Sequence, residues 1–226
     1  MSNAKRDIDK RDNGPLVPLE QWMGRTALPF VPRWMTANQV TGISGGAGML
    51  AGFCYYLASF ANVWFIAGAL LALTQWWADN TDGHVARTRG QASPAGRFLD
   101  LFLDSCTFTA LGVGIAFASY TRFEIVAVAT LLCLVQYVLT VLWIALARIW
   151  PFPPFGPGES SLTLIAMSLA MPFLPRELVV VGGVPLSLFD IAFALTIPSS
   201  LFTIVVSARK LFVHLKTAPA PEVIAG

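Results

Sequence analysis

The sequence predicts an all-α membrane protein: six transmembrane helices around a polar cavity that faces the cytoplasm, preceded by an amphipathic segment in the membrane interface. Three observations lead to this prediction. The 226 residues are 55% hydrophobic and only 12% charged, whereas a soluble domain carries about 25% charged residues. Apolar stretches recur along the chain, and a bilayer span needs roughly 20 mostly apolar residues. Lysine and arginine gather in alternate connections between these stretches.

The first 35 residues contain no apolar stretch long enough to span a membrane. Residues 1–14 are polar and are expected to be disordered. They contain no apolar core beside a small-residue cleavage site, so we expect no signal peptide. Residues 15–35 are broken by proline and charge but mix Trp, Leu and Phe with Arg, which favours a segment lying in the interface. This segment and the helices after it form one predicted membrane domain, 15–215, followed by a C-terminal tail, 216–226.

The predicted helices leave most basic residues on one side of the membrane. With six spans, the N-terminal segment, the second and fourth connections and the tail share a side, and the opposite connections carry only two arginines. Cytoplasmic loops are enriched in Lys and Arg, so we expect both termini in the cytoplasm, in a prokaryotic cytoplasmic membrane. The net charge of +2 does not indicate a nucleic-acid partner. The expected spans, from about 37 to 212, are 37–59, 62–86, 94–120, 123–148, 160–175 and 184–212.

The stretch DNTDGHVARTRGQASPAGRFLDLFLD, residues 79–104, carries four aspartates at the adjoining ends of the second and third predicted helices. On a helix, the spacing of Asp79 and Asp82 puts both on one face, and the spacing of Asp100 and Asp104 does the same. The connection between the two helices is short, so we expect them to be antiparallel neighbours. The four carboxylates are therefore expected to converge on the cytoplasmic side.

Four carboxylates close together near lipid repel one another and lose hydration. Protonation, neutralisation by the nearby arginines, or a bound cation would relieve the repulsion. Mg²⁺ binds carboxylate oxygens and keeps positions open for phosphates, and two such ions suit a diphosphate. One carboxylate would remain to act as a general base. Gly83 and Ala86 would let a flat group approach the helix, Arg87 would pair with phosphate oxygens, and Gly96 would allow close helix packing.

These residues follow the pattern D-x2-D-G-x2-A-R-x8-G-x3-D-x3-D at every fixed position. The pattern resembles the signature of the CDP-alcohol phosphotransferases, also called CDP-alcohol phosphatidyltransferases, a family of integral membrane enzymes of phospholipid synthesis. Six spans after an interfacial segment also resemble this family. The resemblance implies a metal-dependent transferase that cleaves a CDP-alcohol, moves the phosphoryl-alcohol to a hydroxyl acceptor and releases CMP. It also implies a homodimer.

The resemblance further implies roles for individual residues. Asp79, Asp82 and Asp100 would hold the divalent ion, Mg²⁺ or Mn²⁺. Asp104, which forms the catalytic pair with Asp100, would share a second ion and act as the general base that takes the proton of the acceptor hydroxyl. The CDP-alcohol donor would contact residues in and around the motif: Gly83, Ala86, Arg87, Ser93, Gly96 and Asn38.

The first span begins with TANQVTGISGG, which is similar to the family's PN-x2-T entry but has Ala37 where proline is usual. Asn38 and the glycines between 42 and 45 either face the nucleotide, or Asn38 caps the helix and the glycines serve packing. Some charged residues have two interpretations. Glu159 would bind an amino-alcohol acceptor or stabilise a helix start. Arg148 would bind an acceptor phosphate or anchor the protein at the interface, and Arg97 and Arg89 would steer an anionic substrate or bind headgroups.

The sequence does not identify the donor or the acceptor. The usual bacterial arrangement of the family has CDP-diacylglycerol as donor and a small polar alcohol as acceptor. The opposite arrangement, CDP-choline or CDP-ethanolamine with diacylglycerol, is an alternative, because SPAG before Asp100 is similar to the amino-alcohol branch. Possible acceptors are inositol phosphate, glycerol phosphate, serine, choline and ethanolamine. A cation transporter is the alternative from another class, but its polar groups would lie near the midplane, where spans four to six offer few. A lipid-binding scaffold without catalytic activity is the third alternative.

Overall fold

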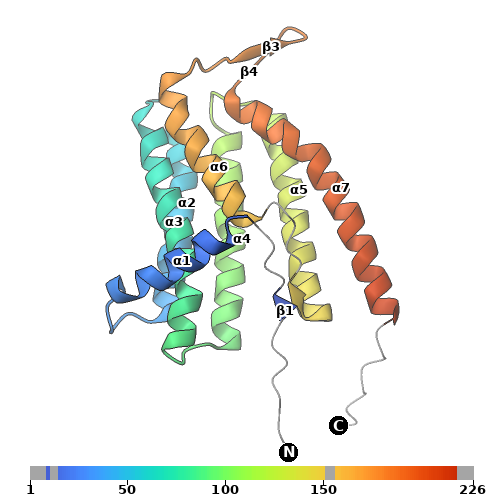
Figure 1. Ribbon diagram of the computed structural model, residues 1–226. Coiled ribbons are helices and arrows are strands. Elements are labelled where there is room, and N and C mark those ends of the chain that lie inside the picture. Colours follow the sequence, from blue (N-terminus) through green and yellow to red (C-terminus); the bar gives the residue numbers. More distant parts are fainter. Residues whose placement is uncertain (1–8, 11–14, 151–155, 218–226) are drawn as a thin grey trace, which may run out of the picture.

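The computed structural model describes residues 9–10, 15–150 and 156–217, which are mostly helical (Figure 1). The described α-helices are α1 Val17–Ala27, α2 Ala37–Leu57, α3 Val63–Thr88, α4 Pro94–Ala116, α5 Phe123–Leu142, α6 Pro157–Ala170 and α7 Leu188–Thr217. Short 3-10 or π-helical turns are η1 Leu28–Phe30, η2 Trp143–Ala147 and η3 Met171–Phe173. Short strands are β1 Asp9–Lys10, β2 Ile149–Trp150, β3 Val179–Val181 and β4 Val184–Leu186.

The expected disorder of residues 1–14 lies outside the described residues, apart from β1, which pairs in parallel with β2. The tail is described only to Thr217, where α7 ends. In the part of the chain that the structure describes, the prediction of a helical protein is confirmed.

The predicted start of the last span is wrong, because a strand occupies it. The last span was expected from residue 184, but residues 184–186 form β4, which pairs antiparallel with β3 around Gly182 and Gly183. Both glycines have positive φ, 59° and 82°, a backbone conformation that residues with a Cβ rarely adopt. The helix begins at Leu188, where the Asp190 carboxylate accepts the backbone N–H of Ser187 at 2.8 Å. A short valine run does not distinguish strand from helix by its pattern alone.

By length and composition, three described helical segments qualify as membrane spans: Pro94–Ala116, Phe123–Ala147 and Leu188–Thr217. They are consistent with an integral membrane protein. α2 has 21 residues and α3 has 26, enough to cross a bilayer by length alone, whereas α6 has only 14. The six-span arrangement and its orientation therefore remain predictions.

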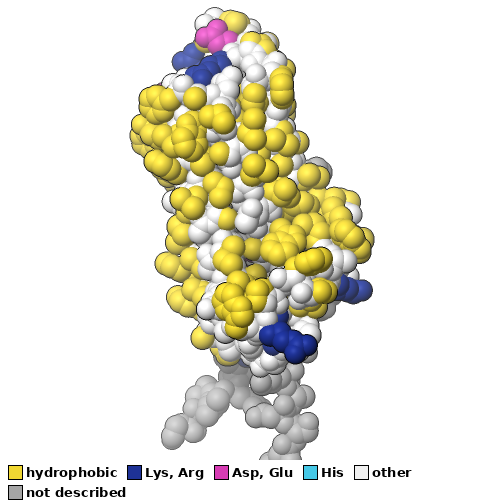
Figure 2. Space-filling model, turned by 90° about the vertical axis from the view of Figure 1, so that its left-hand side faces the viewer, with side chains coloured by type: hydrophobic (Ala, Val, Ile, Leu, Met, Phe, Trp, Pro, Cys, Tyr) yellow, Lys and Arg dark blue, Asp and Glu magenta, His cyan; other side chains and the backbone are white. Residues whose placement is uncertain are grey.

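The surface on the side of α1, α2 and α3 is hydrophobic over most of its height, with Lys and Arg side chains toward its two ends (Figure 2). Such a surface is unusual for a monomer in water and is suited to lipid. The exposed apolar side chains of α2 and α3 include Met49, Leu50, Phe53, Ile66, Leu70 and Leu73.

Glycines bring the backbones of α2 and α4 together. A Cβ on Gly52 would lie 2.3 Å from the carbonyl oxygen of Ala110, and a Cβ on Gly114 would lie 1.9 Å from the carbonyl oxygen of Gly52. Earlier on the same face of α2, Gly45 lies against the Leu103 side chain. Small residues allow this approach in membrane helices, and it places α4 directly beside α2.

α1 lies across the bundle rather than along it (Figure 1). It packs on α3 at Gly24, where a Cβ would lie 2.2 Å from the His84 ring. Glu20 on α1 accepts a hydrogen bond from the indole N–H of Trp76 on α3, at 3.2 Å. The end of α3 also holds the chain after α1, because the Arg89 guanidinium donates to the backbone carbonyls of Val31, Pro32 and Met35. This use of Arg89 matches neither of the roles expected for it.

Candidate active site

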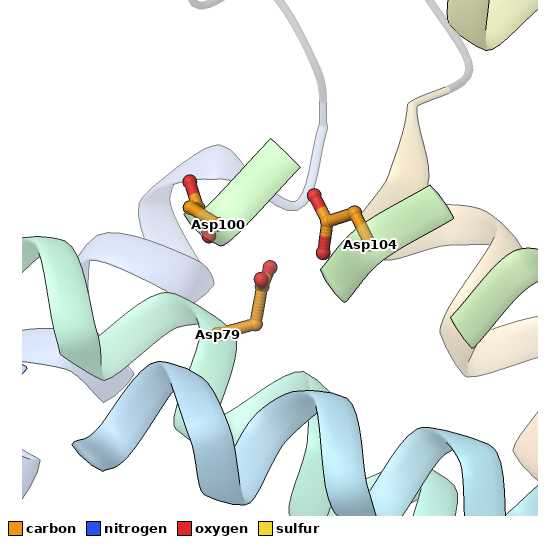
Figure 3. Close-up of side chains that lie close together, drawn as sticks. All are labelled: Asp79, Asp100 and Asp104. Carbon is orange, nitrogen blue, oxygen red and sulfur yellow. The ribbon is translucent and has the colours of Figure 1, made fainter. Parts of the chain in front are cut away.

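Three aspartates from two helices converge between α3 and α4, which both pack on α2 rather than closely on each other. The expectation that these two helices are direct neighbours is therefore wrong. Asp79 comes from α3, and Asp100 and Asp104 come from α4. One carboxylate oxygen of each lies within 4.8 Å of the others, and Figure 3 shows the three side chains pointing toward one another. All three are half-buried. Asp79 lies nine residues before the end of α3, and Asp100 and Asp104 lie six and ten residues after the start of α4. The cluster is therefore roughly 9–15 Å along the helices from their connection.

The three carboxylates interact strongly. The side chains of Asp79 and Asp104 are in hydrogen-bonding contact, and the charge of Asp100 acts on both. Two carboxylates at this separation need a shared proton or a cation between them, because like charges repel in a site of low dielectric. The donor set consists of oxygen atoms only, which suits a hard divalent ion such as Mg²⁺ or Mn²⁺. The residues present therefore fit the metal that the sequence predicts.

The fourth aspartate has a different environment. Asp82 is buried, and its Oδ2 accepts a hydrogen bond from the Thr41 hydroxyl of α2 at 2.6 Å. Its charge acts on Asp104, so it borders the cluster. Within the described residues it is outside the group that meets at 4.8 Å. Thr41 is the threonine of the PN-x2-T pattern, but the sequence assigned it no role; it lies three residues after Asn38 and so on the same face of α2.

The small and basic residues of the motif lie next to Asp82. A Cβ on Gly83 would lie 3.2 Å from Nη1 of Arg87, so the glycine leaves room for this guanidinium. Arg87 is exposed, and its positive charge attracts Asp82. Ala86 packs against a small apolar cluster where α3 meets the start of α2: Val31, Ala37, Val40, Ala78 and Val85.

The first turns of α2 and α4 meet beside the motif. Ser93 is the N-cap of α4 and accepts the backbone N–H of Gly96 at 3.0 Å. A Cβ on Gly96 would lie 3.1 Å from Oδ1 of Asn38, so the glycine allows the two helix starts to approach. The idea that Asn38 caps α2 is wrong, because Thr36 is the N-cap and forms a capping box with Gln39.

Ala37, which stands where the family pattern has proline, also has a hydrogen-bond partner. The backbone N–H of Ala37 donates to Oε1 of Gln91 at 2.8 Å. Proline has no N–H and could not make this bond. The connection between α3 and α4 is thereby held to the start of α2.

The acceptor candidates lie in three separate places. Arg97 is exposed in the first turn of α4, and Arg148 is exposed after η2 with φ of 57°. Glu159 is buried, and its two oxygens accept the backbone N–H groups of Leu16 at 3.2 Å and Gly156 at 2.8 Å. Burial acts to raise the pKa of the Glu159 carboxyl, but its backbone hydrogen bonds together outweigh this effect, and the pKa is lowered. Glu159 thus links the starts of α1 and α6.

The comparison with protein families decides the identity of the chain. The family model of the CDP-alcohol phosphatidyltransferases matches residues 34–205, which include the motif and all four aspartates. The chain belongs to this family. CDP-alcohol phosphatidyltransferases are transferases, so the acid cluster lies within the segment that defines an enzyme family. The recognition of the family from the motif is therefore confirmed.

A solved structure supports the fold. The crystal structure of the Mycobacterium tuberculosis phosphatidylinositol phosphate synthase with CDP-DAG bound covers 90% of this chain and 96% of its own, with a TM-score of 0.64 and 16% sequence identity. At this identity the likeness shows a common fold. None of the curated proteins matches the chain.

Proposed function

We propose that this CDP-alcohol phosphatidyltransferase moves a phosphatidyl group from CDP-diacylglycerol to a hydroxyl acceptor and releases CMP. The convergence of Asp79, Asp100 and Asp104 inside the family segment carries this proposal. The choice of donor is supported by the solved relative of the same fold, which has CDP-DAG bound. The acceptor is a small polar alcohol whose identity the assay below would determine.

Divalent ions, Mg²⁺ or Mn²⁺, belong to the proposal. Asp79, Asp100 and Asp104 would hold them with Asp82 at their border, and two ions would suit the diphosphate of the donor. When bound, such ions would offset the negative charge of the diphosphate and of the departing CMP. Among the protein's own side chains, Arg87 would pair with phosphate oxygens of the donor.

Asp104 is the proposed general base. Its carboxylate lies within 4.8 Å of those of Asp79 and Asp100, so a base at this position would lie beside the ions that hold the donor. It would take the hydroxyl proton as the acceptor oxygen forms a bond to the β-phosphorus of the donor. The bond from this phosphorus to the CMP oxygen would break, and CMP would leave with the electron pair.

The position of α1 supports a reaction at the membrane surface. α1 lies across α3 at Gly24 and Glu20, close to the level of the acids. If α1 lies in the interface, the carboxylates lie at headgroup depth, where the diphosphate of a lipid donor is also found. We further propose that this side faces the cytoplasm with both termini, and that the enzyme is a homodimer.

The experiment is CMP release from the purified protein in detergent with Mg²⁺ or Mn²⁺. CDP-diacylglycerol is offered with inositol phosphate, glycerol phosphate, serine, choline and ethanolamine in turn. We expect CMP release with one acceptor and none after chelation of the metal. Release only from CDP-choline or CDP-ethanolamine with diacylglycerol would replace the proposed donor. No release with any pair, despite bound metal, would contradict the proposed function.

Replacing Thr41 by valine should weaken metal binding. Valine keeps the size of the side chain but removes the hydroxyl that Asp82 accepts at 2.6 Å. Loss of a partner that orients a metal-site carboxylate typically costs 10–100-fold in metal affinity, and we expect about tenfold for Mn²⁺. Thr74→Val is the control, because Thr74 bonds only to the carbonyl of Leu70 in its own helix among the described contacts. Equal Mn²⁺ affinity in both variants would show that Thr41 does not serve the site.

A further inference from the structure

A tyrosine of α5 reaches the turn of α4 that carries the acids. The hydroxyl of Tyr137 donates a hydrogen bond to the backbone carbonyl of Leu101 at 2.6 Å. Leu101 follows Asp100 directly and precedes Asp104 by three residues. The hydroxyl is therefore attached to the segment of α4 between the two acids.

The ring of Tyr137 makes a second contact with α4. Its centroid lies 5.7 Å from that of Phe108, which is one helical turn beyond Asp104. The tyrosine thus contacts α4 on both sides of Asp104, with its hydroxyl on one side and its ring on the other. The charges of Asp104, Asp100 and Asp79 all act on Tyr137, so it lies beside the acid cluster.

The backbone does not need this hydroxyl. Leu101 is inside α4, where its carbonyl already accepts the N–H of the residue four positions later, as in any α-helix. Phenylalanine at position 137 would keep both this bond and the ring contact. It would also avoid a hydroxyl in the candidate span Phe123–Ala147, since a polar group in lipid must find a partner. We therefore expect the Tyr137 hydroxyl to serve the neighbouring acids rather than the backbone of α4.

We propose that Tyr137 is a positioning residue of the acid cluster: it holds the turn of α4 between Asp100 and Asp104 so that their carboxylates face Asp79. Asp79 is on α3, whereas the other two acids are on α4. The separation of the acids therefore depends on the rotation of α4 about its own axis. Tyr137 resists this rotation from the α5 side. Its effect on turnover rests on the proposed function, whereas its effect on metal binding does not require turnover.

The test compares Tyr137→Phe with Tyr120→Phe. Each variant removes one hydroxyl that donates to a backbone carbonyl, but Tyr120 bonds to Tyr55 at 2.9 Å, away from the acids. In Tyr137→Phe we expect about tenfold weaker Mn²⁺ binding, the lower end of the range for residues that orient ligands. At limiting Mn²⁺, the kcat for CMP release should fall to a similar degree, and the KM for the donor should change less than twofold. Tyr120→Phe should change none of the three.

Unchanged Mn²⁺ affinity in Tyr137→Phe would overturn the inference. An equal loss in Tyr120→Phe would also overturn it, because that result would reflect a general loss of stability. If the wild type released no CMP from any donor, the proposed function would fail, and the Mn²⁺ affinities of the two variants would still decide the role of Tyr137. A wild type that bound no Mn²⁺ would overturn both.

Discussion

Replacing Asp104 by asparagine should lower the rate of CMP release by about 10²- to 10⁴-fold, the usual contribution of a positioned general base. Asparagine keeps the shape of the side chain and one oxygen but cannot take the proton of the acceptor hydroxyl. Two of the clustered carboxylates, Asp79 and Asp100, remain in this variant. Mn²⁺ binding should therefore weaken but persist, and the measurement is kcat for CMP release at saturating Mn²⁺.

Two further variants separate the role of a base from that of a ligand. Asp79→Asn should lose Mn²⁺ binding and CMP release together, because Asp79 is the member of the cluster that α3 contributes. Glu124→Gln is the matched control, since Glu124 is exposed in the first turn of α5, at the end remote from the site. A rate for Asp104→Asn within tenfold of the wild type would contradict the assignment of Asp104 as the base.

Replacing Gly52 by alanine should destabilise the protein by about 3 kcal/mol, the upper end of the usual cost of overpacking. The new Cβ would lie 2.3 Å from the carbonyl oxygen of Ala110, and backbone cannot move aside as a flexible side chain can. α2 and α4 would have to separate. Because α4 carries Asp100 and Asp104, CMP release should fall as well. Unfolding in detergent and residual activity measure the two effects.

Gly46→Ala is the control for this prediction. Gly46 lies on the same helix, but a Cβ there would have no neighbouring atom within 4 Å. Alanine favours a helix over glycine by about 1 kcal/mol, so Gly46→Ala should be neutral or stabilising and fully active. If Gly52→Ala were as stable as Gly46→Ala, the close contact between α2 and α4 would be refuted.

The glycines after Asn38 illustrate what a sequence pattern leaves open. The run was expected either to face the nucleotide or to serve packing. In the structure, Gly45 packs against Leu103, whereas Gly42 and Gly46 have open space beside them. Residues one apart on a helix point in different directions, so the side on which a neighbouring helix lies decides the role of each glycine. That neighbour is α4, which begins almost 50 residues later.

The sequence by itself determined the helical class and the family, and it predicted which acids form the site. Each of these follows from local order: apolar runs long enough for helices, and a fixed spacing that puts Asp79 beside Asp82 and Asp100 beside Asp104 on helix faces. The hairpin of β3 and β4 is local as well, but a short apolar run has no period that separates strand from helix.

Only the tertiary structure decided which carboxylates meet and what supports them. Asp79 joins Asp100 and Asp104, while Asp82 turns to Thr41, and Tyr137 reaches α4 from α5. These pairings depend on the rotation and depth of whole helices relative to one another. Rotation and depth are set where backbones and side chains of distant segments touch, and no spacing within a single helix records them.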